Sequence, residues 1–254
     1  LTQHSLVITE SNDDKIHIQY HPTISEKENL QHSSKEKTLE ISDTKSTTRP
    51  SVGSSIQGIL FIVSGVSSRN DEVVLSLPRG KDLKNLTAQV DHRILSIANA
   101  KLSNAKILSN GYLLRITDSE IKNSQLTTTG IVNVFETSLT DSRIQADHEH
   151  ISAEDIQVHG KVELESKKDM VIQLSKKELE RINLNLSSEH GAIYHRTREG
   201  VHPVQGNHEN KDEEFSNPYN VEKKDTQDLL VAKAGQDINI PDEPDRSPNS
   251  RNYE

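Results

Sequence analysis

The chain contains no cysteine and no tryptophan. The absence of cysteine excludes disulfides, thiolate metal sites and a cysteine nucleophile, although it does not fix the compartment. Bulky side chains are scarce as well: hydrophobic residues make up 31% of the sequence and aromatic residues 3%, with one methionine, and the mean hydropathy is -0.71. This composition argues against a compact globule with one bulky core. It suits a repeat fold in which each coil buries a narrow row of side chains.

Positive charge is in deficit, with 30 Lys and Arg residues against 39 Asp and Glu residues and a formal net charge of -9. Nucleic acids and anionic lipids are bound through clustered Lys and Arg, so we expect neither partner. The longest apolar run, Gly58 to Val63, is strand-sized and far short of the roughly 18 to 20 residues that cross a bilayer. Because the sequence begins at Leu1 and enters a strand pattern almost at once, we expect a signal peptide or membrane anchor upstream of this fragment.

Residues 1–85 are typical of N-terminal β-strands that lead into a repeat region. Segments 5–10 and 15–20 flank a Ser-Asn-Asp-Asp turn, and the second segment alternates apolar and polar residues, so a β-hairpin is predicted. Polar residues 22–37 predict a loop. Further strands are expected at 38–42, 56–63 and 72–77, and Pro78 ends the last of them because proline cannot continue a central ladder.

Residues 86–193 are expected to form repeats of about eighteen residues, because apolar positions recur in three columns that keep step. The first column steps by 19, 18 and 17 residues through Ile97, Ile116, Val134 and Ile151. The second has the same steps and consists of Leu102, Ile121, Leu139 and Ile156. The third steps by 19, 18 and 18 through Ile107, Leu126, Ile144 and Val162. Within a coil the columns stand five, five and about eight residues apart, which predicts a triangular cross-section with three short strands.

Turn-forming residues agree with this register. Asn104, Asn123 and Asp141 each follow the second column by two residues, and Asn and Asp tolerate the left-handed conformation of tight turns. Gly111 and Gly130 occupy the third corner. Stacked asparagines could also hydrogen-bond along the solenoid axis.

The C-terminal part of the sequence is less regular. Residues 194–228 carry Gly, Pro, Asn and many charges, which predicts a polar, largely irregular excursion. Residues 229–241 predict a closing pair of strands, and residues 242–254 a disordered tail. The fold class is therefore all-β: a parallel β-solenoid with an N-terminal β-hairpin and strands and a C-terminal strand pair.

Several of these features together resemble a known family. They are the charged N-terminal hairpin, the Leu77-Pro78 motif followed by Leu83 and Leu86, the Asn- and Gly-cornered repeats, and the closing Gly-Gln-Asp-Ile-Asn-Ile stretch. Over residues 1 to about 241 the chain resembles the bacterial putative-adhesin family of β-strand-repeat domains, often called LiaG-like. The resemblance implies a right-handed solenoid ectodomain held by an N-terminal membrane segment in Gram-positive bacteria, with a link to envelope stress. It implies no catalytic residues, and the excursion at 194–228 departs from the family pattern.

The sequence offers candidate residues for two kinds of chemical site, a metal site and a glycosidase site, and each candidate also has a purely structural explanation. His148 and His150 lie two residues apart, as strand ligands of a metal would, but a solvated turn explains them better, and no metal or cofactor is expected. His159 could join them only if the next corner brought it close. Asp118, Glu120, Glu136 and Asp141 are dispersed, whereas glycoside hydrolysis needs two carboxyl groups about 5 to 10 Å apart. We therefore expect no enzymatic activity.

The leading hypothesis is a non-enzymatic, surface-exposed module of the Gram-positive envelope that contacts a protein or a cell-wall polymer. It would meet the membrane only through an anchor outside this fragment. A bactofilin-like structural polymer is the alternative, although the non-repeat strands and the charged excursion would block end-to-end stacking. A polysaccharide-active β-helix enzyme is the third hypothesis.

Overall fold

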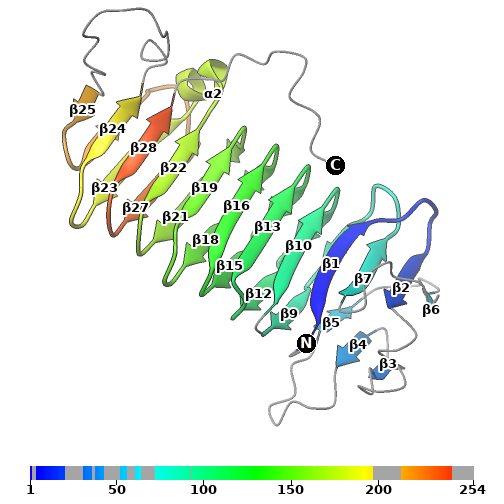
Figure 1. Ribbon diagram of the computed structural model, residues 1–254. Coiled ribbons are helices and arrows are strands. Elements are labelled where there is room, and N and C mark those ends of the chain that lie inside the picture. The colour runs from blue at the N-terminus through cyan, green and yellow to red at the C-terminus, as the bar shows by residue number, and fades with distance from the viewer. Residues whose placement is uncertain are drawn as a thin grey trace, which may run out of the picture.

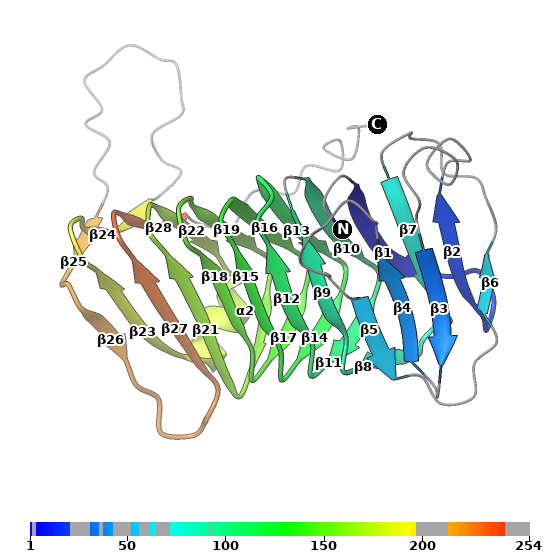
Figure 2. The same cartoon turned by 90° about the horizontal axis from the view of Figure 1, so that it is seen from below.

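The computed structural model describes residues 1, 4–20, 31–35, 38–42, 52–55, 61–63, 72–91, 93–196 and 213–241. These residues form a prism of stacked coils, with β-sheets on three faces (Figures 1 and 2). The predicted parallel β-solenoid is therefore confirmed. No helix in the described ranges has both the length and the apolar character needed to cross a membrane.

Face A is a 12-stranded sheet that runs the length of the prism. In spatial order its strands are β25 (Glu213–Phe215), β24 (Ile193–Arg196), β28 (Ile238–Pro241), β22 (Met170–Gln173), β19 (Ile151–Glu154), β16 (Ile131–Phe135), β13 (Leu113–Thr117), β10 (Ile94–Ala98), β1 (Ser5–Glu10), β7 (Glu72–Leu77), β2 (Ile16–Tyr20) and β6 (Phe61–Val63).

Face B has 11 strands and face C has five. In spatial order face B consists of β26 (Tyr219–Val221), β23 (Asn183–Ser188), β27 (Leu229–Ala234), β21 (Lys161–Ser166), β18 (Arg143–Ala146), β15 (Gln125–Thr128), β12 (Lys106–Ser109), β9 (Thr87–Val90), β5 (Val52–Ser55), β4 (Thr38–Ser42) and β3 (Gln31–Lys35). Face C consists of β20 (Gln157–His159), β17 (Ser138–Thr140), β14 (Glu120–Lys122), β11 (Lys101–Ser103) and β8 (Asp82–Lys84).

The three apolar columns are confirmed for the first three coils. Ile97, Ile116 and Val134 are paired neighbours on face A. The members of the second column pair likewise on face C, and those of the third column on face B. Their side chains are at most 3% exposed. Each strand of a coil thus buries only a few apolar side chains. A sequence with so few hydrophobic residues can therefore still form a continuous core.

At the fourth coil all three column assignments are wrong by two residues. Val134 pairs with Ala153 where Ile151 was predicted, Leu139 with Val158 where Ile156 was predicted, and Ile144 with Leu164 where Val162 was predicted. Ile151, Ile156 and Val162 are buried, but Ile151 pairs with Val132, Ile156 lies at the corner between β19 and β20, and Val162 lies in β21 and pairs with Leu230. The prediction placed the columns on these apolar residues because alternate residues of a strand face the same side. The sequence pattern therefore cannot distinguish between two inward positions that are two residues apart.

The first corner joins face A to face C, and the second joins face C to face B. Asn104, Asn123 and Asp141 at the second corner have φ values of 55°, 48° and 44°, so the predicted left-handed turns are confirmed. The third corner carries Gly111 and Gly130 for another reason. A Cβ on Gly111 would lie 1.7 Å from the carbonyl oxygen of Arg93, so glycine is required by the close approach of adjacent coils.

Serine hydroxyls and the Asp141 carboxylate, and not stacked asparagines, supply the side-chain hydrogen bonds along the axis at the second corner among the described residues. The backbone N–H of Ala105 donates to Ser124 Oγ at 3.0 Å, and the N–H of Ser124 donates to Ser142 Oγ at 3.2 Å. Each hydroxyl in turn donates to the carbonyl two residues before it, at 2.7 Å. These buried hydroxyls satisfy N–H groups that the turn removes from the sheets.

At the N-terminal end the predicted strands are present, but the hairpin is wrong. β7 lies between β1 and β2, pairing in parallel with the first and antiparallel with the second. β1 also pairs in parallel with β10 on its other side. The loop expected at 22–37 contains β3, and of the strand expected at 56–63 the described part is β6. Non-local pairing of this kind leaves no mark in local alternation.

The strands expected at 229–241 are present as β27 and β28, but they do not close the end of the prism. β27 lies between β21 and β23, and β28 lies between β22 and β24. The region 194–228, expected to be largely irregular, contains β25 and β26, which pair antiparallel with β24 and β23 as the outermost strands. The expected disordered tail, 242–254, lies outside the described residues.

Face C ends where helix α2 (Lys176–Arg181) replaces the next strand. The backbone N–H of Val158 in edge strand β20 donates to Glu178 Oε1 at 2.7 Å, and Arg181 donates to the carbonyl of Val158. Two side chains thus satisfy the backbone groups that a further strand would have paired, which closes the sheet without exposing a free edge.

Candidate functional site

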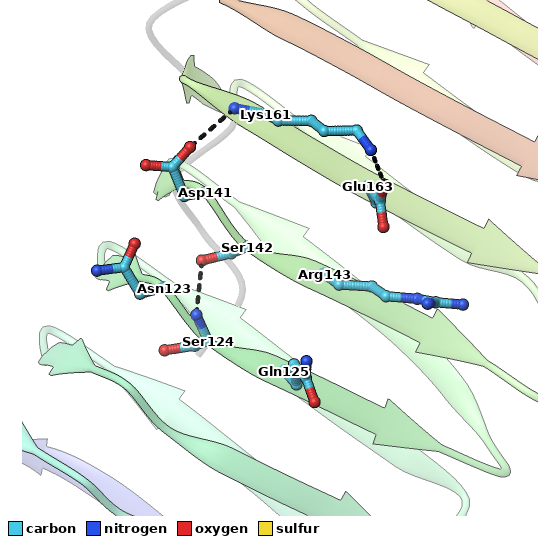
Figure 3. Close-up of a pocket in the computed structure, with 8 residues that line it drawn as sticks. All are labelled: Asn123, Ser124, Gln125, Asp141, Ser142, Arg143, Lys161 and Glu163. Carbon is cyan, nitrogen blue, oxygen red and sulfur yellow. Dashed lines mark hydrogen bonds and ion pairs between the residues drawn. The ribbon is translucent and has the colours of Figure 1, made fainter.

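A surface groove of about 380 Å³ lies at the second corner, where coils two to four turn onto face B (Figure 3). Three successive corners line it, contributing Asn123, Ser124 and Gln125, then Asp141, Ser142 and Arg143, then Lys161 and Glu163. In each coil the chain turns at the residue with a left-handed backbone conformation. The strand of face B that follows this residue then places its first outward side chain beside the groove. The repeat therefore places chemically similar atoms in register along the axis.

A bulge at Lys161 shapes the groove. Thr140 pairs with His159 and Arg143 pairs with Glu163, so the fourth coil has one more residue at this corner than the third. Gly160 takes the left-handed position at φ 61°, and the backbone N–H of Lys161 donates to Asp141 Oδ1 at 3.0 Å. An extra residue of this kind disrupts the pairing locally, and Lys161 is one of the residues that line the groove.

Both basic groups of the groove, and Glu163, are in ion pairs. Lys161 Nζ lies 2.5 Å from Glu163 Oε1, and Arg143 forms an ion pair with Glu165. The Lys161 ammonium, through this contact, lowers the pKa of Glu163 against the opposing effect of partial burial. Glu163 is thus held as a carboxylate, whereas a general acid of glycoside hydrolysis needs a raised pKa.

Hydrogen bonding is what this groove offers a ligand. Its walls present the side-chain amides of Asn123 and Gln125, one guanidinium and one ammonium group. Such groups donate to hydroxyl, carboxylate and phosphate oxygens. The groove contains no histidine, cysteine or tyrosine, and no serine of the groove is paired with a base: Ser124 and Ser142 donate to backbone carbonyls.

The histidines considered for a metal lie elsewhere. His148 is exposed in the turn between β18 and β19, and His150 directly precedes β19 and is half-buried. His159 is exposed at the end of β20 on face C, so it does not join them. Within the described ranges, no three His, Asp or Glu side chains converge as metal ligands would.

Sequence reasoning identified Asn123 and Asp141 as corner residues but missed Gln125, Arg143, Lys161 and Glu163 as partners in one groove. Gln125 and Arg143 gave no signal in the sequence, because they occupy ordinary outward positions of short strands. The signal for the last two was the spacing of Gly160 and Leu164, which is wider than that of the preceding corner and marks the bulge.

The fold defines a class: a parallel β-solenoid closed at each end by antiparallel strands. A family model described as Toastrack DUF4097 matches residues 1–93 and 94–241, so the chain belongs to the Toastrack family.

No curated protein gives a significant match. A solved structure, the crystal structure of a "putative cell adhesion protein" from Clostridium sporogenes, aligns with 95% of this chain and 94% of its own at 12% identity and a TM-score of 0.29. At this identity and TM-score the likeness supports no conclusion about function.

Proposed function

We propose that this Toastrack domain is a non-enzymatic interaction module on the extracellular face of a Gram-positive cell membrane, acting in adhesion or in envelope stress. The observation that carries the proposal is the groove of the second corner, which offers hydrogen-bond donors and paired charges without an acid and base arranged for catalysis. Four carboxyl groups of the described residues have a shifted pKa, and all four are lowered.

The capped ends argue against a bactofilin-like polymer. Coils stack end to end only if each end presents an open parallel edge. At the C-terminal end β25 and β26 run antiparallel to their neighbours, and Pro218 lies between them. At the other end β2 on face A and β3, β4 and β5 on face B introduce antiparallel pairs. Edges of this kind prevent stacking of further coils.

Protease shaving of intact cells tests the location. The protein should be cleaved by externally added protease while a cytosolic control protein survives. Full protection on intact cells, together with filaments of the purified domain in electron micrographs, would replace this proposal with the polymer. Release of reducing or unsaturated ends from a panel of polysaccharides would replace it with an enzyme.

A further inference from the structure

Basic side chains follow the second corner at one per coil. On face C the outward row beside this corner pairs Lys84 with Ser103, Ser103 with Lys122, and Lys122 with Thr140. On face B the matching row pairs Thr87 with Lys106, Lys106 with Gln125, and Gln125 with Arg143. From the coil of β8 to that of β18 the cation therefore alternates between the two sides of the corner. In the next coil Lys161 stands at the start of β21, outside both rows, because Arg143 pairs with Glu163. We name this set the cation ladder: Lys84, Lys106, Lys122, Arg143 and Lys161.

The first three members of the cation ladder are available for a ligand. Lys84, Lys106 and Lys122 are exposed and make no ion pair among the described residues. Arg143 and Lys161 are paired with glutamates, yet their side chains remain 46% and 59% exposed. Two carboxylates of the groove, Asp141 and Glu163, weaken the positive potential over the last two coils. The unpaired cations are thus those of the coils of β8, β11 and β14. The carboxylates on the same stretch of face C are Asp82, which accepts a hydrogen bond from Ser103 Oγ at 2.8 Å, and Glu120, which is paired with Lys101.

The first corner has the opposite charge. Its left-handed positions are Asn99, Asp118, Glu136 and Asp155, where the second corner has three asparagines and one aspartate over the same number of turns. Glu120 and Glu154 flank it on faces C and A, and Lys101 beside it is ion-paired with Glu120. Carboxylates therefore outnumber cations at the first corner, whereas unpaired lysines stand at the second, in a chain of net charge -9. A local positive strip on an acidic molecule attracts anions that the molecule as a whole repels.

The uncharged polar groups between the cations indicate which class of ligand the second corner binds. The two rows hold hydroxyls and amides at Ser103, Thr140, Thr87 and Gln125, and the corner itself adds Asn104 and Asn123. Amides and hydroxyls bond sugar hydroxyls. Neither row has a Phe, Tyr or Trp on which a nucleic-acid base could stack. Neither has the free sheet edge or apolar pocket by which extended peptides are bound.

We propose that the second corner binds a linear acidic polysaccharide that lies along the solenoid axis, with its anionic groups over the cation ladder and its hydroxyls on the corner amides. Adjacent coils stand about 4.8 Å apart, so the ladder spans about 19 Å, long enough for several sugar residues. Each single contact is weak at the surface, and the repeat makes the binding multivalent. The inference rests on the proposed function for its physiological setting, but its test uses the purified full chain.

The experiment compares two triple variants with equal loss of charge. K84Q/K106Q/K122Q removes the free members of the ladder, and K176Q/K177Q/K224Q removes three exposed lysines at and near α2. Binding of fluorescent hexagalacturonate is measured by anisotropy over a salt series. The ladder variant should lose about tenfold or more in affinity and show a flatter salt dependence, whereas the control variant should stay within about twofold of wild type. Thermal midpoints of both variants should match wild type.

Other probes separate the possible sources of the anion and the possible partners. A phosphorylated oligosaccharide of the same length distinguishes phosphate from carboxylate as the preferred group, and either preference supports the proposal. Equal loss in both triple variants, or wild-type binding of neutral maltohexaose as tight as that of hexagalacturonate, would overturn it. Tighter binding of oligothymidylate or hexaglutamate than of either acidic polymer would assign the corner to nucleic acid or to an acidic peptide instead. Protease shaving can fail independently of any of these results.

Discussion

At the scale of single residues, the second corner depends on one backbone conformation that few side chains accept. Asn85, Asn104, Asn123 and Asp141 all have φ between 44° and 60°, and Gly160 has φ 61°. Their backbone N–H groups donate to the coil above, as that of Asn123 does to Thr140 at 2.9 Å. Asn and Asp at this position tolerate the left-handed region, while the serines that follow Asn123 and Asp141 provide hydrogen bonds along the axis.

Asn123→Val should destabilise the protein by about 1 to 3 kcal/mol, because a β-branched residue resists positive φ. Asn123→Gly should be milder, since glycine accepts this conformation freely. Urea denaturation of both variants gives the two free energies of unfolding. Greater tolerance of valine than of glycine would contradict the left-handed turn at this corner.

Ile121→Asp and Leu126→Asp should each abolish cooperative folding. Both side chains are 1% exposed in a core one side chain wide, so an unpaired carboxylate there costs several kcal/mol and cannot move to solvent. Lys122→Asp is the matched control, because Lys122 lies between them in the sequence but faces water. Thermal melts should separate the control from the other two, and a similar loss in all three would refute the register.

At the scale of strands and helices, local periodicity predicted most strands of the first three coils and their neighbours along the axis. It failed at the fourth coil because corners changed length there. The third corner has two residues between β15 and β16, Thr129 and Gly130, but a longer turn around His148 between β18 and β19. Lys161 then adds the bulge. Length changes at corners shift every later column, and the sequence of a corner carries little apolar signal by which to detect them.

Pairing between distant strands was beyond sequence reasoning for a different reason. The strands β1 and β2 were predicted at nearly correct bounds, yet their alternation is the same whether they pair with each other or with β7. The groove met the same limit. Asn123 and Asp141 could be assigned to a corner, but which side chains share a groove depends on the register of the fourth coil.

The closure of face C predicts a specific loss of stability in acid. Asp228 Oδ1 accepts the N–H of Gly160 at 2.7 Å, and Arg181 donates to its other oxygen. Burial raises the pKa of Asp228, but the hydrogen bonds from Gly160 and Arg181 outweigh it, so the pKa lies below its usual value of 3.8. A group with a lowered folded pKa stabilises the fold above its unfolded pKa and loses that contribution as the pH falls through the folded value.

Asp228→Asn should therefore cost about 1 to 3 kcal/mol near neutral pH, and the difference from wild type should shrink as the pH falls below about 4. Urea denaturation at a series of pH values measures it. Asp225→Asn is the control, because Asp225 is exposed in the same loop. A difference that stays constant down to the acid limit would mean that the ionised carboxylate of Asp228 does not hold the end of face C.

At the scale of the whole molecule, both ends of the prism are built from strands that are not the ends of the sequence. β1 lies inboard of β7 and β2, and β27 and β28 lie inboard of β23 to β26. Each inboard strand pairs in parallel with both of its neighbours. In a repeat fold each coil is stabilised by its two neighbours, so an inboard strand holds the coils on both sides of it. The antiparallel strands outside them then close the edges.

Truncation after residue 226 should consequently unfold the C-terminal cap while leaving the central coils intact. It removes β27 and β28, which are the parallel neighbours of β23 and β24, and it removes Asp228 from the closure at α2. Amide hydrogen exchange should show protection lost in β23 to β26 and retained in β10 to β18, since stability in a solenoid is a sum over neighbouring coils.

A chain truncated after residue 241 is the control for that deletion, because it keeps both inboard strands and should exchange as the full chain does. If β23 and β24 kept their protection in the shorter chain, they would have moved one coil along to pair with β21 and β22 directly. The inboard strands would then be dispensable. Loss of protection throughout β10 to β18 would instead mean that the solenoid folds as one unit, with the C-terminal strands required by coils that they do not touch.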